Sequence, residues 1–249
     1  MPRYRLTVEY DGSAFQGWQA QDGAPTVQGT IEAAAARLNG GVRAVLHAAG
    51  RTDAGVHATG QVAHFDLEKD YSALAVRDAL NFHMKPMPVA ITEVSIAPPE
   101  FHARFQAIGR HYRYRILARR PPPAYTVGRV WHVTRALDIE AMRAGAAVLL
   151  GTHDFTSFRA TECQAKSPVK TLDRLEVFAA GEEIHVEASA RSFLHHQVRI
   201  MVGTLRLAGE GKWTPADIIA ALDARKRAAA GPTAPAEGLT LTGVDYPAG

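Results

Sequence analysis

The sequence predicts an α+β protein with two mixed subdomains, whose sheets form the walls of a cleft. Strand-like segments of alternating polar and apolar residues are mixed with segments of helical periodicity along the chain. The proline-rich run at 119–123 can continue neither a helix nor a central strand, so it predicts a crossover between two halves. At 249 residues and 47% hydrophobic composition, the chain can bury two half-sized cores. We expect subdomains at 1–105 and 106–249.

Periodicity and turn chemistry predict the individual elements of both halves. Asp138 is expected to cap a helix that extends to about Leu150, and Thr214 is expected to begin another, with a first-turn proline and Asp217 at the third position. Gly181 predicts a hairpin turn, and Ser192 is a candidate cap for a helix that ends near Gly209. The expected strands are 4–10, 42–48, 61–66, 88–97, 110–117, 170–179, 183–189 and 239–245, and the remaining expected helices are 27–38 and 72–82.

Charge and cysteine content restrict the possible partners and compartments. The 28 Lys and Arg residues against 25 Asp and Glu give a net charge of only +3, so a polyanion must be bound by local clustering of charge. Cys163 is the only cysteine and cannot form an internal disulfide, which favours a reducing compartment, and we expect the cytoplasm. The N-terminus lacks a signal-peptide core, and no run approaches the about 18 apolar residues that span a bilayer. We therefore expect no membrane association.

Residues 50–57, with the sequence GRTDAGVH, form the most informative motif. Asp53 lies between Gly50 and Gly55, and the glycines permit positive φ and the close approach of another molecule. Arg51 favours the ionised carboxylate. Such a carboxylate can act as a nucleophile or a base, whereas the alternative is that Arg51 and Asp53 only stabilise a surface turn.

A basic and aromatic segment extends from residue 101 to residue 120. It contains six arginines, two histidines, four aromatic residues and no acid. A period of two puts Tyr112, Tyr114 and Ile116 on one face of a strand and His111, Arg113 and Arg115 on the other. Aromatic rings beside guanidinium groups suit single-stranded or looped RNA, and the alternative is an ordinary core strand with solvated arginines.

The expected helix from Ser192 to Gly209 carries a further candidate. Arg199 lies about a quarter-turn from the expected buried face, where it is a candidate partner for the Asp53 carboxylate. The alternative is an arginine with a buried stem and a solvated head. The expected buried face consists of Leu194, Val198, Met201 and Leu205.

The sequence favours neither a metal nor an organic cofactor. Eleven histidines are present, but no HExxH motif or Cys and His cluster occurs among them. On a helix the adjacent His195 and His196 would point about 100° apart, which is poor geometry for one ion. There is also no P-loop lysine motif and no GxGxxG after a strand.

Six ordered blocks closely resemble the tRNA pseudouridine synthase A family over nearly the whole chain. The resemblance implies the pseudouridine synthase fold, with two mixed subdomains whose largely antiparallel sheets flank a central active-site cleft, and no metal or cofactor. The chain departs from the family pattern at residues 81–89, where many members have an acid that is missing here, and at Tyr71, where some relatives have a basic tRNA contact. The blocks are Tyr10-Asp11-Gly12 with Gly17-Trp18-Gln19, residues 50–57, Phe101-His102-Ala103-Arg104-Phe105, residues 154–159, Phe193-Leu194-His195-His196, and Thr233-Ala234-Pro235.

The resemblance also implies an activity and the roles of individual residues. The family isomerises uridine to pseudouridine at positions 38 to 40 of the tRNA anticodon stem-loop, and its members are homodimers. The resemblance implies that Asp53 is the catalytic aspartate. Tyr112 then contacts the target base, Arg199 pairs with the aspartate, and Arg51 assists base flipping. The implied RNA contacts are Phe101, His102, Ala103, Arg104, Phe105, Arg120, Glu162, Cys163, Gln164, Ala165 and Lys166.

Two other classes of function remain alternatives on the residues alone. One is a non-catalytic RNA-binding protein that uses the same basic and aromatic strand, and the other is a metal-dependent hydrolase. Asp53→Asn distinguishes the isomerase from the binding protein, and a chelator distinguishes it from the hydrolase.

Overall fold

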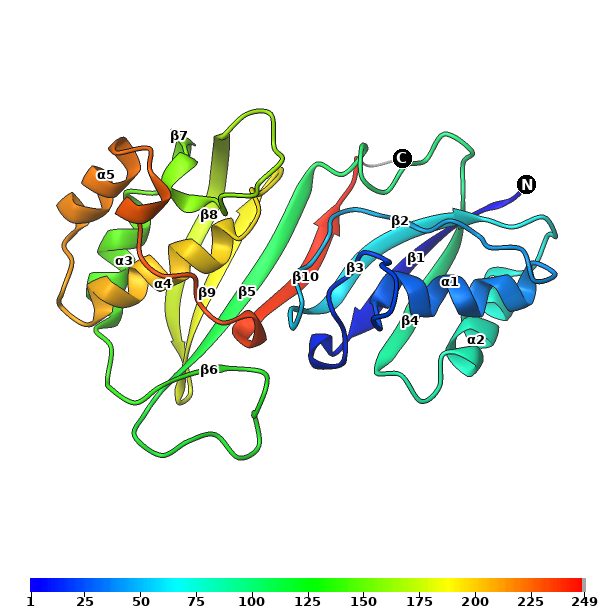
Figure 1. The fold of residues 1–249 in the computed structure, drawn as a ribbon, viewed down its shortest axis with the longest axis horizontal. Helices are drawn as coiled ribbons and strands as arrows, with labels where there is room; N and C mark the ends of the chain where they lie inside the picture. The colour runs from blue at the N-terminus through cyan, green and yellow to red at the C-terminus, as the bar shows by residue number, and fades with distance from the viewer. Residues whose placement is uncertain (248–249) are drawn as a thin grey trace. The chain divides into compact units, whose positions relative to one another are not determined.

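The computed structural model describes residues 1–247, which contain ten strands and five α-helices (Figure 1). Two compact units are present. The first is Met1–Ile108 together with the chain from Thr240, and the second is Gly109–Leu239. The boundary near residue 108 lies close to the expected one at 105, but the last strand packs with the first unit. The predicted subdomains did not include this return of the chain.

The first unit is built on a sheet in the order β4, β1, β3, β10, with the short β2 paired to β3. β1 is antiparallel to both β3 and β4, whereas β10 is parallel to β3. Alternate β1 residues, Tyr4, Leu6 and Val8, are fully buried, as the period of two predicts. The strands are β1 (Arg3–Tyr10), β2 (His47–Ala48), β3 (His57–Asp66), β4 (Val89–Ala97) and β10 (Leu239–Asp245).

Two helices complete the first unit, at the positions expected from the sequence, and each begins at a capping side chain. The Thr26 side chain accepts from Gly29 N at the start of α1 (Val27–Leu38), and Ser72 accepts from Ala75 N at the start of α2 (Ala73–His83). α2 packs against β4 and also contacts α1. Both helices are drawn beside the strands of this unit in Figure 1.

The second unit has an antiparallel sheet in the order β5, β9, β8, β7, and β6 pairs in parallel with β5. Helix α3 packs against α4 and against β8. Gly181 turns the β8–β9 hairpin with a φ of +63°, as expected. The elements are β5 (Gly109–Ala118), β6 (Trp131–Val133), α3 (Ile139–Ala147), β7 (Gly151–Asp154), β8 (Val169–Ala180), β9 (Glu183–Ala190), α4 (Gln197–Gly209) and α5 (Pro215–Asp223).

Short 3-10 helices occur at four places in the described chain. They are Gly12–Ala14, Thr156–Phe158, Arg227–Ala229 and Ala236–Gly238. No helix among residues 1–247 is long and apolar enough to cross a bilayer.

The strand expected over 42–48 is reduced to the two residues of β2. The backbone at Leu46 is hydrogen-bonded by side chains of α1, where a strand would be bonded by a neighbouring strand. Leu46 N donates to Glu32 Oε1 at 2.9 Å, and Gln28 Nε2 donates to Leu46 O at 3.2 Å. These bonds occupy the backbone N–H and C=O of Leu46, which would otherwise pair with a neighbouring strand of a sheet.

The predicted start of the last long helix at Ser192 is wrong, because α4 begins at Gln197. His196 has a φ of +62°, a left-handed conformation that a right-handed helix cannot include. The Gln197 side chain reaches back and accepts from Leu194 N at 2.8 Å. Leu194 is therefore buried in the segment before the helix, whereas Val198, Met201 and Leu205 are buried on α4 as predicted.

Candidate active-site elements

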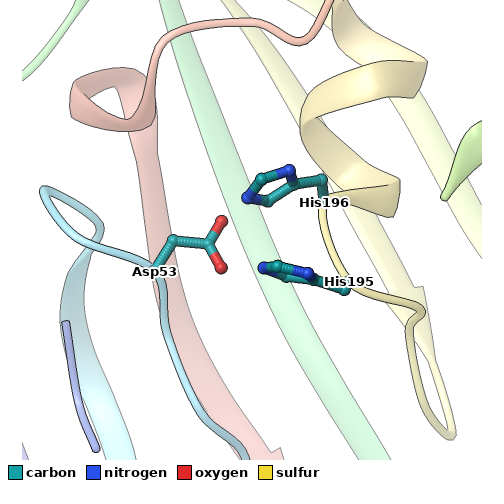
Figure 2. Close-up of side chains that lie close together, drawn as sticks. All are labelled: Asp53, His195 and His196. Carbon is teal, nitrogen blue, oxygen red and sulfur yellow. The ribbon is translucent and has the colours of Figure 1, made fainter. Parts of the chain in front are cut away.

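Asp53 lies in the loop between β2 and β3 and is half-buried. Val56 N donates to Asp53 O at 3.2 Å, which closes a tight turn, and Gly55 adopts a φ of +78° within it. The expected positive φ therefore holds for Gly55 but not for Gly50. Figure 2 shows the Asp53 carboxylate projecting from this loop.

Three hydrogen bonds hold the residues just before Asp53, two at backbone carbonyls and one at the Thr52 side chain. Trp18 N donates to Thr52 O at 3.0 Å, and Tyr10 Oη lies 2.7 Å from Thr52 Oγ1. Gln61 Nε2 donates to Gly50 O at 2.8 Å. Tyr10, Trp18 and Gln61 are all buried. Because these bonds already fix the loop, its backbone at Asp53 need not lose conformational freedom when another molecule binds.

Two glycines allow the chain to pack directly against the Asp53 loop. A Cβ on Gly12 would lie 2.1 Å from Val56 O, and one on Gly17 would lie 2.9 Å from Thr52 O. Gly17 also has a φ of +89°. His57 adds a side-chain anchor, since its Nδ1 accepts from Gly12 N at 3.0 Å and lies 3.2 Å from Asp11 Oδ1. The motif blocks at 10–12 and 17–19 therefore both support the Asp53 loop.

Tyr10, Trp18, Gln61 and His57 are supporting residues that the sequence reasoning did not assign. The motif blocks at 10–12 and 17–19 carried a signal for the first two. Gln61 and His57 lie in β3, where their polar side chains are buried in an otherwise largely apolar strand. A buried polar side chain needs a hydrogen-bond partner, and here the partners belong to the Asp53 loop and its neighbours. Arg51 is exposed beside Asp53, and its role in base flipping stays a prediction.

Tyr112 and Arg199 lie in the second unit. Tyr112 is half-buried on β5, opposite Ala188 of β9, and its ring meets Phe193 edge to face with centroids 5.2 Å apart. Arg199 Nε donates to Ala234 O at 2.8 Å, and Ala234 N donates to Arg199 O at 3.1 Å. The pairing of Arg199 with Asp53 would join the two units and stays a prediction.

The segment Thr233-Ala234-Pro235 is held by two elements of the second unit. Besides the Arg199 bonds, Tyr114 Oη donates to Pro235 O at 2.7 Å. Gly238 lets the chain pass the Tyr114 ring, because a Cβ there would lie 2.6 Å from two ring carbons. Burial raises the pKa of Tyr114, so this phenol stays protonated and keeps donating its hydrogen bond.

His195 and His196 are not on a helix, so the predicted angle of 100° between them does not apply. They lie in the segment before α4, and their ring centroids are 4.0 Å apart (Figure 2). His195 Nδ1 also lies 3.7 Å from Glu162 Oε1. The argument against a metal from helical spacing is thereby removed. The left-handed φ of His196 brings the two rings side by side.

The segment 101–105 exposes only part of its predicted RNA contacts. Phe101 and Ala103 are buried and His102 is half-buried, whereas Arg104 and Phe105 are exposed. The 73% exposure of Phe105 leaves an aromatic ring accessible for stacking on a base. Elsewhere, Arg120, Glu162, Gln164 and Lys166 are exposed, and Cys163 and Ala165 are half-buried.

The cationic face expected on the 110–117 strand is neutralised within the second unit. Arg113 Nη2 lies 2.7 Å from Glu187 Oε1, and Arg115 Nη2 lies 2.7 Å from Glu183 Oε1. Both acids belong to β9, the antiparallel neighbour of β5. The local run contains no acid, but strand pairing brings carboxylates from about 70 residues away. Arg113 and Arg115 therefore take part in ion pairs within the sheet. A basic surface for RNA would have to consist of arginines other than these two.

The α+β fold, the rigidly held carboxylate and the exposed basic and aromatic turn are together typical of an enzyme that acts on RNA. A family model described as tRNA pseudouridine synthase matches residues 6–106 and 146–247. The chain thus belongs to the tRNA pseudouridine synthase family, and it is an isomerase that acts on uridines of tRNA.

Individual relatives match over their whole length. The chain is 63% identical over 248 residues to a tRNA pseudouridine synthase A of Paramagnetospirillum magneticum, an alignment that covers 100% of this chain and 96% of the relative. It is 57% identical to a protein of that name from Maricaulis maris, with 99% of both chains covered. It is 59% identical to another from Methylobacterium nodulans, covering 99% of this chain and 97% of the relative.

Proposed function

We propose that Asp53 is the catalytic residue of a pseudouridine synthase that acts at positions 38 to 40 of the tRNA anticodon stem-loop. The observation that supports this most strongly is the rigid support of its loop by Tyr10, Trp18 and Gln61. Catalysis requires a reacting group to be held near its productive geometry before substrate arrives. No other carboxylate of the family blocks is presented from a turn with this support.

The proposed reaction rearranges the uridine without an external oxidant or reductant. The bond between N1 of the base and C1′ of the ribose breaks, the uracil rotates, and a bond forms between its C5 and the same C1′. The proton on C5 is released and N1 gains one, so that substrate and product have the same atoms. Asp53 takes part either as a nucleophile or as a base, and no metal or organic cofactor is required by this balance.

We assign supporting roles to three further residues near the reacting nucleotide. Tyr112 contacts the target base, and its edge-to-face contact with Phe193 supports a fixed ring orientation. Arg199 pairs with the catalytic carboxylate, and its Nε bond to Ala234 O supports a fixed guanidinium. Arg51 helps the uridine leave its stack, which costs a few kcal/mol that contacts to the extruded nucleotide must offset.

The proposed RNA surface consists of residues 101–105, Arg120 and residues 162–166. Their exposed side chains include the basic Arg104, Arg120 and Lys166 and the aromatic Phe105. RNA recognition by shape relies on such backbone and stacking contacts, and this suits several adjacent target positions in different sequences. We further propose a homodimer in which one tRNA touches both subunits, and sedimentation velocity at micromolar concentration tests this by the mass of the particle.

The catalytic assignment is tested by Asp53→Asn, which removes the negative charge with little change in shape. We expect pseudouridine formation on unmodified tRNA transcripts to fall below detection, whereas tRNA affinity stays within a few-fold of the wild type. Position-resolved mapping of pseudouridine in the wild-type reaction tests positions 38 to 40 at the same time. Asp22→Asn, at an exposed acid in another turn, is the matched control and should retain full activity. Product from Asp53→Asn at the wild-type rate would refute the assignment.

The RNA surface is tested by Arg104→Ala. A guanidinium that contacts a phosphate displaces about one counterion, so its loss lowers the slope of log K against log salt by about 0.7 to 0.9. We expect weaker tRNA binding with this smaller slope, measured by filter binding from low to moderate salt. Arg37→Ala, at an exposed arginine near the end of α1, should leave the slope unchanged. An unchanged slope in Arg104→Ala would remove this residue from the phosphate contacts.

A further inference from the structure

The turn at 101–106 is held from inside by its own hydrogen bonds. Gln106 N donates to His102 O at 3.1 Å, and His102 N donates to Gln106 Oε1 at 3.3 Å. Arg104 N donates to His102 Nδ1 at 3.2 Å, and the His102 and Phe105 rings have centroids 4.3 Å apart. These bonds define the shape of the turn. They do not attach it to the rest of the first unit.

Ala103 attaches the turn to the first unit, because both of its backbone polar groups are bonded to buried or half-buried side chains. Ala103 N donates to His64 Nδ1 at 3.2 Å, and Tyr246 Oη donates to Ala103 O at 2.6 Å. Ala103 itself is fully buried, next to the exposed Arg104. His64 belongs to β3, and Tyr246 directly follows β10. Two strands far apart in the sequence therefore fix one residue at the base of the turn.

We propose that His64 and Tyr246 are positioning residues for tRNA binding, which hold Ala103 from both sides so that Arg104 and Phe105 are presented in a fixed conformation. The proposal rests on the proposed role of residues 101–105 as an RNA contact. Neither side chain has to touch the RNA. An ordered turn loses less conformational entropy when tRNA binds, and this preserves affinity.

His64 is suited to this role because its surroundings keep the imidazole neutral. An Nδ1 that accepts a hydrogen bond must be unprotonated, so the ring proton is on Nε2. The side chain is 2% exposed, and its ring lies 4.7 Å from that of His102 and 5.1 Å from that of His47, centroid to centroid. Burial, with the nearby His102, Arg3 and His47, lowers the pKa of His64 to about 4. The acceptor is thus available throughout the neutral range.

Tyr246 is anchored in turn by aromatic and cationic contacts. Its ring centroid lies 5.2 Å from that of Phe101, and the Arg5 guanidinium carbon lies 4.6 Å from the Tyr246 ring centroid. Phe101 packs in a buried cluster with Ala49, Val62, Ala97 and Ala103. Arg3 Nη1 donates to Phe101 O at 2.8 Å, and Arg3 also pairs with Asp66. The hydroxyl that bonds Ala103 is therefore held at one end of a packed array.

The test compares variants that remove one hydrogen bond with variants that keep it. His64→Leu removes the acceptor, whereas His64→Asn keeps an oxygen near the position of Nδ1. Tyr246→Phe removes only the hydroxyl and preserves the ring. Tyr4→Phe is the matched control, because it removes another buried tyrosine hydroxyl of the same unit, one that bonds Tyr71 instead of the turn.

Two measurements are made on each variant. Hydrogen exchange of the amides at 101–106 reports the order of the turn, and tRNA binding with turnover at saturating tRNA separates affinity from chemistry. We expect His64→Leu and Tyr246→Phe to speed exchange and to raise the Kd for tRNA about tenfold, with kcat nearly unchanged. His64→Asn and Tyr4→Phe should retain the wild-type exchange and Kd.

Each other outcome overturns part of the proposal. Unchanged exchange in both His64→Leu and Tyr246→Phe would show that these residues do not order the turn. If His64→Leu fails to fold, Tyr246→Phe decides the question alone. Faster exchange with an unchanged Kd would refute the link to tRNA. In that case Arg104→Ala separates the causes, because a normal Kd there as well would mean that the turn is not an RNA contact.

Discussion

Gly12 has no side chain, and this absence determines the geometry of the Asp53 loop. Its Cα faces Val56 O so closely that a methyl group would lie 2.1 Å from that oxygen. The backbone carbonyl cannot move without shifting the turn from Asp53 to Val56. The smallest substitution at this position therefore displaces the Asp53 loop without removing any polar group.

We expect Gly12→Ala to lower kcat by about 10- to 100-fold, because displacing a reacting group by about 1 Å has effects of this size. Affinity for tRNA should stay within a few-fold, since residue 12 is not part of the proposed RNA surface. Steady-state kinetics on tRNA transcripts check this. Gly40→Ala, at a glycine with a φ of +64° and open space around it, introduces backbone strain away from the Asp53 loop and should leave kcat unchanged. A normal kcat in Gly12→Ala would show that the loop tolerates the displacement.

His64 makes the stability of the protein depend on pH in a definite direction. Its folded pKa of about 4 is below the unfolded value near 6.5, so the unfolded chain binds a proton first as the pH falls. The stabilisation is complete above about pH 6.5 and is lost as the pH falls toward 4. It amounts to at most about 3 kcal/mol in the free energy of unfolding. His102, whose pKa is also lowered by burial, adds to the effect in the same direction.

Urea unfolding at pH 7 and pH 4.5 measures this dependence. We expect wild-type protein to lose more stability between the two pH values than His64→Asn, which has no group that titrates at this position. Equal losses in the two proteins would mean that His64 is not the proton-binding group. The comparison between variants removes the contribution of carboxylates, which are common to both.

At the scale of elements, α5 begins with a complete capping box. Thr214 N donates to Asp217 Oδ2 at 2.7 Å, and Asp217 N donates to Thr214 Oγ1 at 3.4 Å. We expect Thr214→Ala to lower the free energy of unfolding by about 1 kcal/mol, because the first-turn amide loses its acceptor. Urea unfolding checks this. Thr214→Ser keeps the hydroxyl and should restore most of the loss, while turnover at 25 °C is unchanged in both variants.

Elements whose ends depend on local chemistry were predicted well from the sequence. Asp138 and Thr214 cap their helices as expected, and the helices expected at 27–38 and 72–82 begin at the caps Thr26 and Ser72. The cap and the amide it binds are three residues apart, so the signal is contained in one short segment. The hairpin at Gly181 is local in the same sense.

Elements that depend on distant partners were predicted poorly. The 42–48 strand is shortened by side chains of α1, and α4 starts late because of the left-handed His196 and the Gln197 side chain. The basic face of β5 is paired by acids of β9. For the strand and the basic face, the deciding group is a side chain whose contact depends on the tertiary arrangement. For α4 the contact is local, because Gln197 binds Leu194 three residues away, and the left-handed φ of His196 has no counterpart in the periodicity. Periodicity within a window cannot contain that information.

At the scale of the whole molecule, the family and its activity were predictable because six family motifs occur in order along the chain. The family comparison confirms both the family and the activity. The individual roles of Asp53, Tyr112, Arg199 and Arg51 stay predictions. The association of β10 with the first unit was not predictable, although the strand at 239–245 was. Its periodicity indicates a strand but does not select β3, about 180 residues earlier, as the neighbour.

The late arrival of β10 has a consequence for synthesis on the ribosome. Gly60 leaves room for the backbone at Thr242, where a Cβ would lie 2.4 Å from the Thr242 oxygen, and Ile108 N donates to Asp245 O at 2.8 Å. When the first 108 residues have emerged, the position beside β3 that β10 will occupy is still empty. More than 130 further residues must be synthesised before β10 can pair there. During that interval a nascent chain exposes an open sheet edge, and the turn at 101–106 gains its Tyr246 anchor only after β10 has been synthesised.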